Sequence, residues 1–115
     1  SDLHLMMLGT YLLAESSNES IIESIKVLNK SLFLNKYNSY SWYLLAKAYA
    51  LSDNLPLAQY ASAERYYLNG DRPLALEFAK KAIKNIDKNT VEWYRTNDLI
   101  ELILGIDEKD NKNRS

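Results

Sequence analysis

The chain has 115 residues and no cysteine, and 47% of its residues are apolar while 25% are charged. These values predict one folded domain and exclude wholesale disorder, disulfide bonds and thiolate metal sites. The formal net charge is −1, from 14 basic and 15 acidic residues. Nucleic-acid-binding proteins usually carry a basic excess, so the sequence predicts no nucleic-acid partner.

Apolar residues recur at helical spacing along most of the chain, which predicts an all-α fold. A polar break at residues 16–18 separates the first two helices, and Pro56 is expected in the first turn of the fourth, where proline is tolerated. The first helix is predicted at about 2–15, and the second runs from the polar break to about 35. The other four are predicted at about 39–52, 55–69, 72–87 and 89–104. Residues 1–104 are therefore predicted to form one helical domain, followed by a polar tail, 105–115, that is expected to be disordered.

Two tryptophans, Trp42 and Trp93, lie three steps of 17 residues apart. An aromatic residue, a leucine, a small residue and a tyrosine stand at offsets 0, 3, 4 and 7 from Trp42, and the next step holds Gln59, Ser62, Ala63 and Tyr66 at the same offsets. The turn sequence of 54–58 returns in similar form at 71–75. A repeat of this length predicts an array of helical hairpins, because one hairpin cannot bury its apolar face alone.

These residues resemble the tetratricopeptide repeat, whose pattern is W-x2-L-G-x2-Y followed by A-x3-F, A and P. The matching positions are Trp42, Leu45, Ala46, Tyr49 and Ala58 in one unit, Gly70, Asp71, Ala75, Ala79 and Ala82 in the second helix of the next, and Leu5, Leu8, Gly9 and Leu12 in an earlier one. Ser62 replaces the expected aromatic residue, and neither helix pair ends in proline. The resemblance implies a short right-handed solenoid of antiparallel hairpins, with about six helices and an irregular middle.

A narrower resemblance covers residues 36–104. The runs 41–46, 61–65 and 70–71, and Trp93-Tyr94-Arg95 with Asp98, are similar to the C-terminal repeat domain of periplasmic HExxH zinc metalloproteases. In that family the repeat domain packs against the protease and docks on outer-membrane barrel proteins and their assembly machinery. This chain has no HExxH, and His4 is its only histidine. The resemblance therefore implies a docking part without catalytic residues or a cofactor of its own, the zinc belonging to a parent protein.

The candidate binding surface follows from the geometry of repeat arrays, in which the first helix of each hairpin lines the concave face. Tyrosine is a frequent contact residue because it offers a large area and a hydroxyl group. The residues predicted to line a partner-binding groove are Tyr40, Tyr43, Lys47, Tyr60, Glu64 and Tyr67, with Ala50, Leu57, Met6 and Thr10 beside them. The expected ligand is a protein or an extended polypeptide.

The sequence thus predicts a non-catalytic protein-interaction domain, with no catalytic, cofactor-binding or metal-binding residues. Its predicted role is docking for a periplasmic zinc metalloprotease in outer-membrane protein quality control. The alternative is a repeat scaffold or cochaperone domain, periplasmic or cytoplasmic, with no link to a protease. The longest apolar stretch, 5–14, is too short to span a bilayer. Because the chain begins Ser1-Asp2-Leu3 without Met, we expect it to be a piece of a longer protein.

Overall fold

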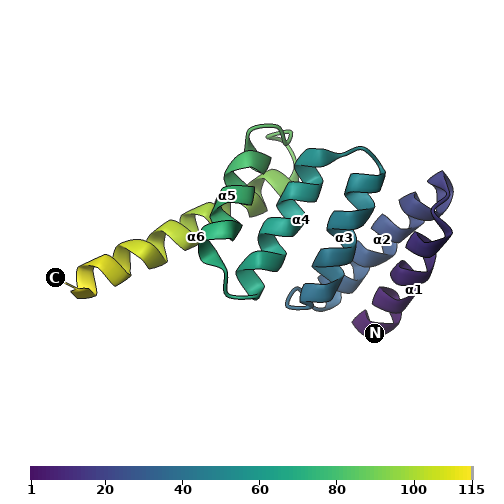
Figure 1. The fold of residues 1–115 in the computed structure, drawn as a ribbon, viewed down its shortest axis with the longest axis horizontal. Helices are drawn as coiled ribbons and strands as arrows, with labels where there is room; N and C mark the ends of the chain where they lie inside the picture. Colours follow the sequence, from purple (N-terminus) through teal and green to yellow (C-terminus); the bar gives the residue numbers. More distant parts are fainter. Residues whose placement is uncertain (115) are drawn as a thin grey trace.

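The computed structural model describes residues 1–114, which form six α-helices and no strand. The helices are α1 (Asp2–Glu15), α2 (Asn18–Leu34), α3 (Ser39–Leu51), α4 (Leu55–Leu68), α5 (Arg72–Ile83) and α6 (Val91–Arg114). They form an elongated body of 53 × 28 × 20 Å with the two termini at opposite ends of its long axis (Figure 1). The predicted all-α solenoid of helical hairpins is confirmed.

Helices that follow one another in the chain also pack against one another. The most extensive pairs are α4 with α5, α1 with α2, and α3 with α4, and α6 contacts both α5 and α4. Among the described residues, no Cα atom of α2 lies within 8 Å of one in α4 or α6. The helices α2 and α6 are therefore separated from each other, while α3 and α4 connect the two ends of the array (Figure 1).

Side-chain caps define where most of the helices begin. Ser17, Asn38, Asn54 and Asp71 each accept a hydrogen bond from the backbone N–H three residues further on, at the starts of α2, α3, α4 and α5. Such caps satisfy N–H groups that have no partner within the helix. Gly70, with φ of +85°, provides the left-handed turn between α4 and α5. These turn residues account for the short connections that the repeat pattern predicts.

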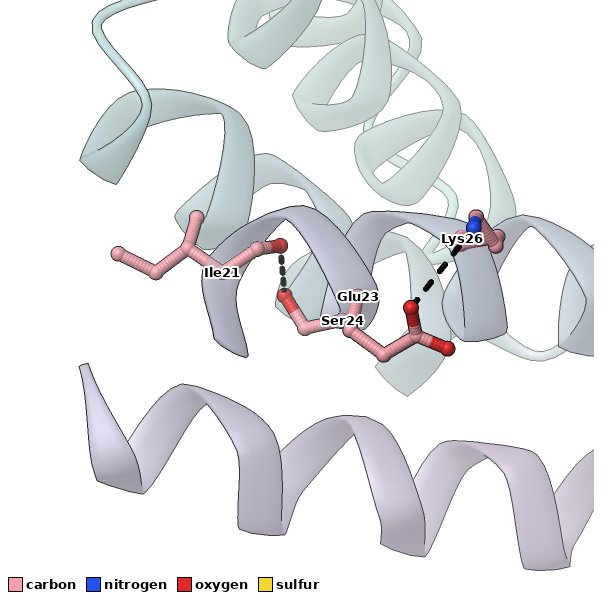
Figure 2. A network of polar contacts seen from close by, with 4 residues as sticks. All are labelled: Ile21, Glu23, Ser24 and Lys26. Atoms are coloured by element: carbon pink, nitrogen blue, oxygen red, sulfur yellow. Dashed lines mark hydrogen bonds and ion pairs between the residues drawn. The ribbon is translucent and has the colours of Figure 1, made fainter. Parts of the chain in front are cut away.

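The contact between α1 and α2 depends on small residues. A Cβ atom on Gly9 of α1 would lie 2.6 Å from Cδ2 of the fully buried Leu28 of α2, so any other residue would force one of the two helices or the Leu28 side chain to shift. Ser24 is also fully buried, and its hydroxyl donates a 2.6 Å hydrogen bond to the Ile21 carbonyl of its own helix (Figure 2). A buried serine whose hydroxyl is hydrogen-bonded in this way allows two helices to approach closely and leaves no polar atom without a partner.

Alanines allow a similarly close contact between the later helices. Six alanines of α4 and α5 are buried: Ala58, Ala61, Ala63, Ala75, Ala79 and Ala82. Ala46 of α3 is partly buried and packs against the core. Ala63, Ala75 and Ala79 form one core cluster with two residues of α6, Leu99 and Ile103. Small side chains therefore allow α4 and α5 to pack closely against their neighbours.

Two predicted helix ends are wrong. The fifth helix ends at Ile83 and not near 87, because the side chain of Asp87 accepts from the Asn89 N–H and its carbonyl accepts from the Thr90 hydroxyl, forming a turn before α6. The sixth helix does not end near 104 but continues to Arg114.

The residues 105–114 of the expected disordered tail therefore belong to α6, and residue 115 lies outside the described residues. No proline interrupts this segment, and Gly105 is accommodated within the helix. An ion pair of 3.4 Å joins Asp110 to Arg72 of α5, and Glu108 pairs with Lys112 at 3.8 Å. Pairs at i, i+4 support a helix even where it packs against nothing.

Candidate functional site

A cleft of about 640 Å³ lies between α2 and α6, over α3 and α4. We refer to it as the α2–α6 cleft. The α2 wall consists of Asn29, Leu32, Phe33 and Lys36, which follow the spacing i, i+3, i+4 and i+7, with Tyr37 beyond them. Asn29, Leu32 and Phe33 share one face of the helix, and Lys36 and Tyr37 lie in the turn that follows its end at Leu34. Phe33 is 87% exposed although it is large and apolar.

The α6 wall has the same spacing. It consists of Arg95, Asp98, Leu99 and Leu102, again at i, i+3, i+4 and i+7. Leu99 is buried against α4 and α5, whereas Leu102 is 48% exposed toward the cleft. Each wall thus has a buried leucine at its base and an exposed apolar residue beside it, Leu32 with Phe33 on α2 and Leu99 with Leu102 on α6.

The floor belongs to α4 and α3. Glu64, Tyr67 and Leu68 of α4 line it together with Trp42 of α3. The indole N–H of Trp42 donates a 2.9 Å hydrogen bond to the carbonyl of Lys36, and its ring meets Tyr60 edge-on at 5.5 Å between centroids. Trp42 therefore fixes the turn that holds Lys36 at the rim of the cleft, while packing the floor from below.

A second set of polar contacts holds the same turn. The side-chain amides of Asn35 and Asn38 donate to the carboxylate of Asp2 at 3.3 and 3.2 Å. The buried hydroxyl of Ser31 contacts that of Ser41 at 2.9 Å and donates to the Asp2 backbone carbonyl. The start of α1, the end of α2 and the start of α3 are thereby joined. The α2 wall is consequently a fixed part of the fold.

Glu64 is the most perturbed group in the cleft. Burial raises the pKa of its carboxyl to about 7, and the positive charges of Arg95 and Lys36 only partly oppose this effect. Within residues 1–114 its carboxylate has no hydrogen bond and no ion pair within 4 Å. Near neutral pH the cleft floor therefore carries a carboxyl group that is partly protonated and lacks a close cationic partner.

Arg95 lies on the α6 side of this carboxyl group. The pKa of Arg95 is raised, first by a hydrogen bond with the Tyr60 side chain and further by the charges of Glu92 and Glu64. The pKa of Tyr60 is raised well above its ordinary range, mainly because the residue is buried. Arg95 is exposed at the rim of the cleft, and its hydrogen-bond partner is the neutral Tyr60 hydroxyl and not Glu64.

The structure divides the residues that were predicted to form one groove. Glu64 and Tyr67 line the α2–α6 cleft. Tyr60, predicted to contact a partner, is only 2% exposed and supports the floor from inside the core. Its placement on a groove surface was therefore wrong. A large aromatic residue that alternates with small ones on α4 fills the space next to Trp42, and the sequence pattern does not distinguish this position from an exposed one.

The remaining predicted residues lie elsewhere. Tyr40, Tyr43 and Lys47 are exposed on α3 but do not line the cleft. The rings of Tyr40 and Tyr43 stack at 5.7 Å, and the guanidinium of Arg65 lies 4.9 Å from the Tyr43 ring. The prediction treated α3 and α4 as equivalent first helices of two hairpins, but α4 follows α3 in the same hairpin and presents a different face. Whether the α3 residues contact a partner stays a prediction.

The sequence reasoning missed both walls of the cleft. Phe33, Tyr37 and Leu102 were not selected, and Arg95 and Asp98 entered only as part of a family resemblance. A signal was present, because Phe33 and Leu102 are large apolar residues just outside the core stripes of their helices. Without knowing that α2 and α6 flank the same opening, that signal did not indicate a shared site.

The fold and the site together define a class: a solenoid of helical hairpins with an open, partly apolar cleft across one face. When the chain is compared with models of protein families and with curated protein sequences, no match is found. Within residues 1–114, no helix is both long and apolar enough to cross a membrane. The same part of the chain contains no group of three His, Asp or Glu side chains arranged to hold a metal ion.

Proposed function

We propose that the chain is a non-catalytic docking domain that binds a segment of a partner protein in the α2–α6 cleft. The observation that carries this proposal is the exposure of large apolar side chains, above all Phe33, around an opening whose base is already packed. Exposed apolar surface next to a concave site is typical of an interaction surface.

The composition of the cleft favours binding over catalysis. A carboxyl group with a pKa near 7, such as that of Glu64, is also suited to general acid–base chemistry. However, the lining residues include no histidine, serine, threonine or cysteine, and among the described residues no lysine or arginine forms an ion pair with Glu64 within 4 Å. Apolar and aromatic side chains with a few charged groups are the usual composition of a protein-docking site.

The test uses a displayed library of random peptides, selected on the wild-type chain. The affinities of the selected peptides are then measured by fluorescence anisotropy for the wild type and for Phe33→Asp. We expect Phe33→Asp to weaken binding at least tenfold, the order of effect seen when a central apolar contact is lost. Because Phe33 is 87% exposed, the substitution should leave the fold intact, which far-UV circular dichroism checks.

A matched control is available on the same helix. Ile22 of α2 is 62% exposed but does not line the cleft, so Ile22→Asp makes a similar chemical change about three turns away from Phe33 on the same helix. Binding that is lost in Phe33→Asp and kept in Ile22→Asp supports the proposal. Binding that Ile22→Asp weakens as much as Phe33→Asp, or a selection that yields no peptide sensitive to Phe33, contradicts it.

A finer proposal concerns the biological context. We propose that the partner belongs to a periplasmic zinc-metalloprotease system, either the protease domain of the same parent protein or a component of outer-membrane barrel assembly. The support for this is the resemblance of residues 36–104 alone. The alternative is a scaffold or cochaperone domain with no protease. The coding sequence upstream of this chain decides between them: an HExxH motif supports the first, and its absence supports the second.

A further inference from the structure

The two walls and the floor of the α2–α6 cleft share one geometric property. Asn29, Leu32 and Phe33 on α2 follow the spacing i, i+3 and i+4. Glu64, Tyr67 and Leu68 on α4 follow the same spacing, and Arg95, Asp98, Leu99 and Leu102 on α6 extend it to i+7. Each helix thus presents one ridge of side chains to a common space. Ridges of this kind are the surface that a helix offers to another helix packed against it.

From this arrangement we infer that the occupant of the cleft is an amphipathic α-helix that places a lysine or arginine against Glu64. This inference rests on the proposed docking function and specifies its ligand. The helix would lie between α2 and α6 on α4, with apolar residues against Phe33 and Leu102.

The size of the cleft fits such an occupant. One turn of a helix with its side chains fills roughly 400–600 Å³, from a diameter of about 10–12 Å and a pitch of 5.4 Å. The wall residues from Arg95 to Leu102 cover about 10 Å of the axis of α6, which corresponds to two turns. Two turns of helix, half embedded, therefore require about the 640 Å³ that the cleft offers.

The charges in the cleft favour a cation at its centre. Glu64 lies in the floor without a hydrogen bond or a close ion pair among the described residues. The charged and titratable groups that line the cleft with it are Lys36 and Tyr37 after α2, Arg95 and Asp98 on α6, and Tyr67 on α4, with Tyr60 below. Lys36 and Arg95 are exposed at the rim, and they do not prevent burial from raising the pKa of Glu64 to about 7.

A cation on the ligand can pair directly with the Glu64 carboxylate, which Lys36 and Arg95 do not do. A lysine or arginine placed in the apolar centre of the cleft forms a charge-assisted hydrogen bond with the ionised carboxylate. It also replaces water around a group that burial has already deprived of part of its hydration. An acidic or neutral residue at the same position would leave Glu64 without a partner, and binding would be weaker.

The test uses three synthetic peptides of about 18 residues, a length at which alanine-based helices begin to form in water. The first has leucines at i, i+3 and i+7 and a lysine at i+4, in an alanine background with glutamines on the opposite face. The second replaces the lysine by glutamine. The third retains every contact residue of the first but has a proline at a central alanine on the opposite face, which breaks a helix and leaves an extended chain possible.

We expect the lysine peptide to bind the wild-type chain at least tenfold more tightly than the proline peptide. It should also bind about tenfold more tightly than the glutamine peptide near pH 8.5, in line with the usual strength of a hydrogen bond to a charged group. This second preference should fall below about twofold near pH 5.5, because Glu64 with a pKa of about 7 is then protonated. In Glu64→Gln the preference should be absent at both pH values. Glu77→Gln, which neutralises an exposed carboxylate on α5, should retain it.

The outcomes separate the inference from the docking function on which it rests. If the proline peptide binds as tightly as the lysine peptide, and both lose affinity in Phe33→Asp, the cleft docks an extended segment and the helical occupant is wrong. If the lysine and glutamine peptides bind equally at pH 8.5, the inference that a lysine or arginine of the ligand contacts Glu64 is wrong. If no peptide, designed or selected from the library, responds to Phe33→Asp, the docking function itself fails.

Discussion

Replacing Glu64 by glutamine should stabilise the protein at alkaline pH. Burial raises the pKa of this carboxyl from 4.5 to about 7, so the folded chain holds a proton there that the unfolded chain releases more readily. A difference of this size corresponds to about 3 kcal/mol of unfolding free energy. Because Glu64 is partly accessible from the cleft, we expect about 1–3 kcal/mol to be observed.

The pH at which this effect appears follows from the direction of the shift. Below pH 4.5 the carboxyl group is protonated in both states and contributes nothing. Between pH 4.5 and about 7 the folded state binds more protons than the unfolded state, so the free energy of unfolding falls as the pH rises. Above about pH 7 the cost of burying the ionised carboxylate is fully present. Glutamine has nearly the same shape and no charge, so it avoids this cost at every pH.

The assay is urea denaturation of the wild type and Glu64→Gln at several pH values from about 4.5 to 8.5, followed by circular dichroism. The difference in unfolding free energy between the two proteins should be near zero at the acidic end and should grow to about 1–3 kcal/mol in favour of the variant at the alkaline end. Glu77→Gln, at an exposed position on α5, should show no comparable trend. A difference that is constant with pH, or that favours the wild type at pH 8.5, refutes this account of the cleft.

Three further predictions concern the packing of the helices. Gly9→Ala should lower the free energy of unfolding by about 1–2 kcal/mol, since overpacking against Leu28 outweighs the higher helix propensity of alanine; a stabilised variant in urea denaturation contradicts the close contact. Gly105→Ala, where a Cβ atom meets nothing within 4 Å, should instead stabilise α6 by up to about 1 kcal/mol, and a loss of thermal stability contradicts its helical assignment. Ser31→Ala should cost about 1–2 kcal/mol in the same denaturation assay, because it leaves the buried Ser41 hydroxyl without this partner and frees the start of α1; an unchanged midpoint contradicts that role.

The sequence by itself determined the helical class and most of the helix boundaries. Periodic apolar residues, side-chain caps and glycine or proline in the turns act over a few residues, so they can be recognised in the chain. This is why the predicted limits of α1 to α4 agree with the structure. The end of α6 was missed because a polar segment after Gly105 has no apolar periodicity, although it is held in a helix by local pairs and by Arg72.

The sequence also identified two of the residues that line the cleft. Glu64 and Tyr67 were selected from their position on one face of α4, and the structure places both in the floor. A face of a single helix is a local property, so it could be read from the spacing alone. The same reasoning placed Tyr60 on that surface, but the depth of a residue depends on its neighbours in space, and Trp42 covers it.

Only the tertiary structure brought the two walls together. Phe33 and Leu102 are separated in the chain by the three helices α3, α4 and α5, yet the packing of these helices places both residues at one opening. The raised pKa of Glu64 likewise depends on burial by residues of other helices. Local patterns determine which segments become helices and which faces are apolar. The packing angles of six helices determine which of those faces remain open to a partner, and no short stretch of sequence encodes these angles.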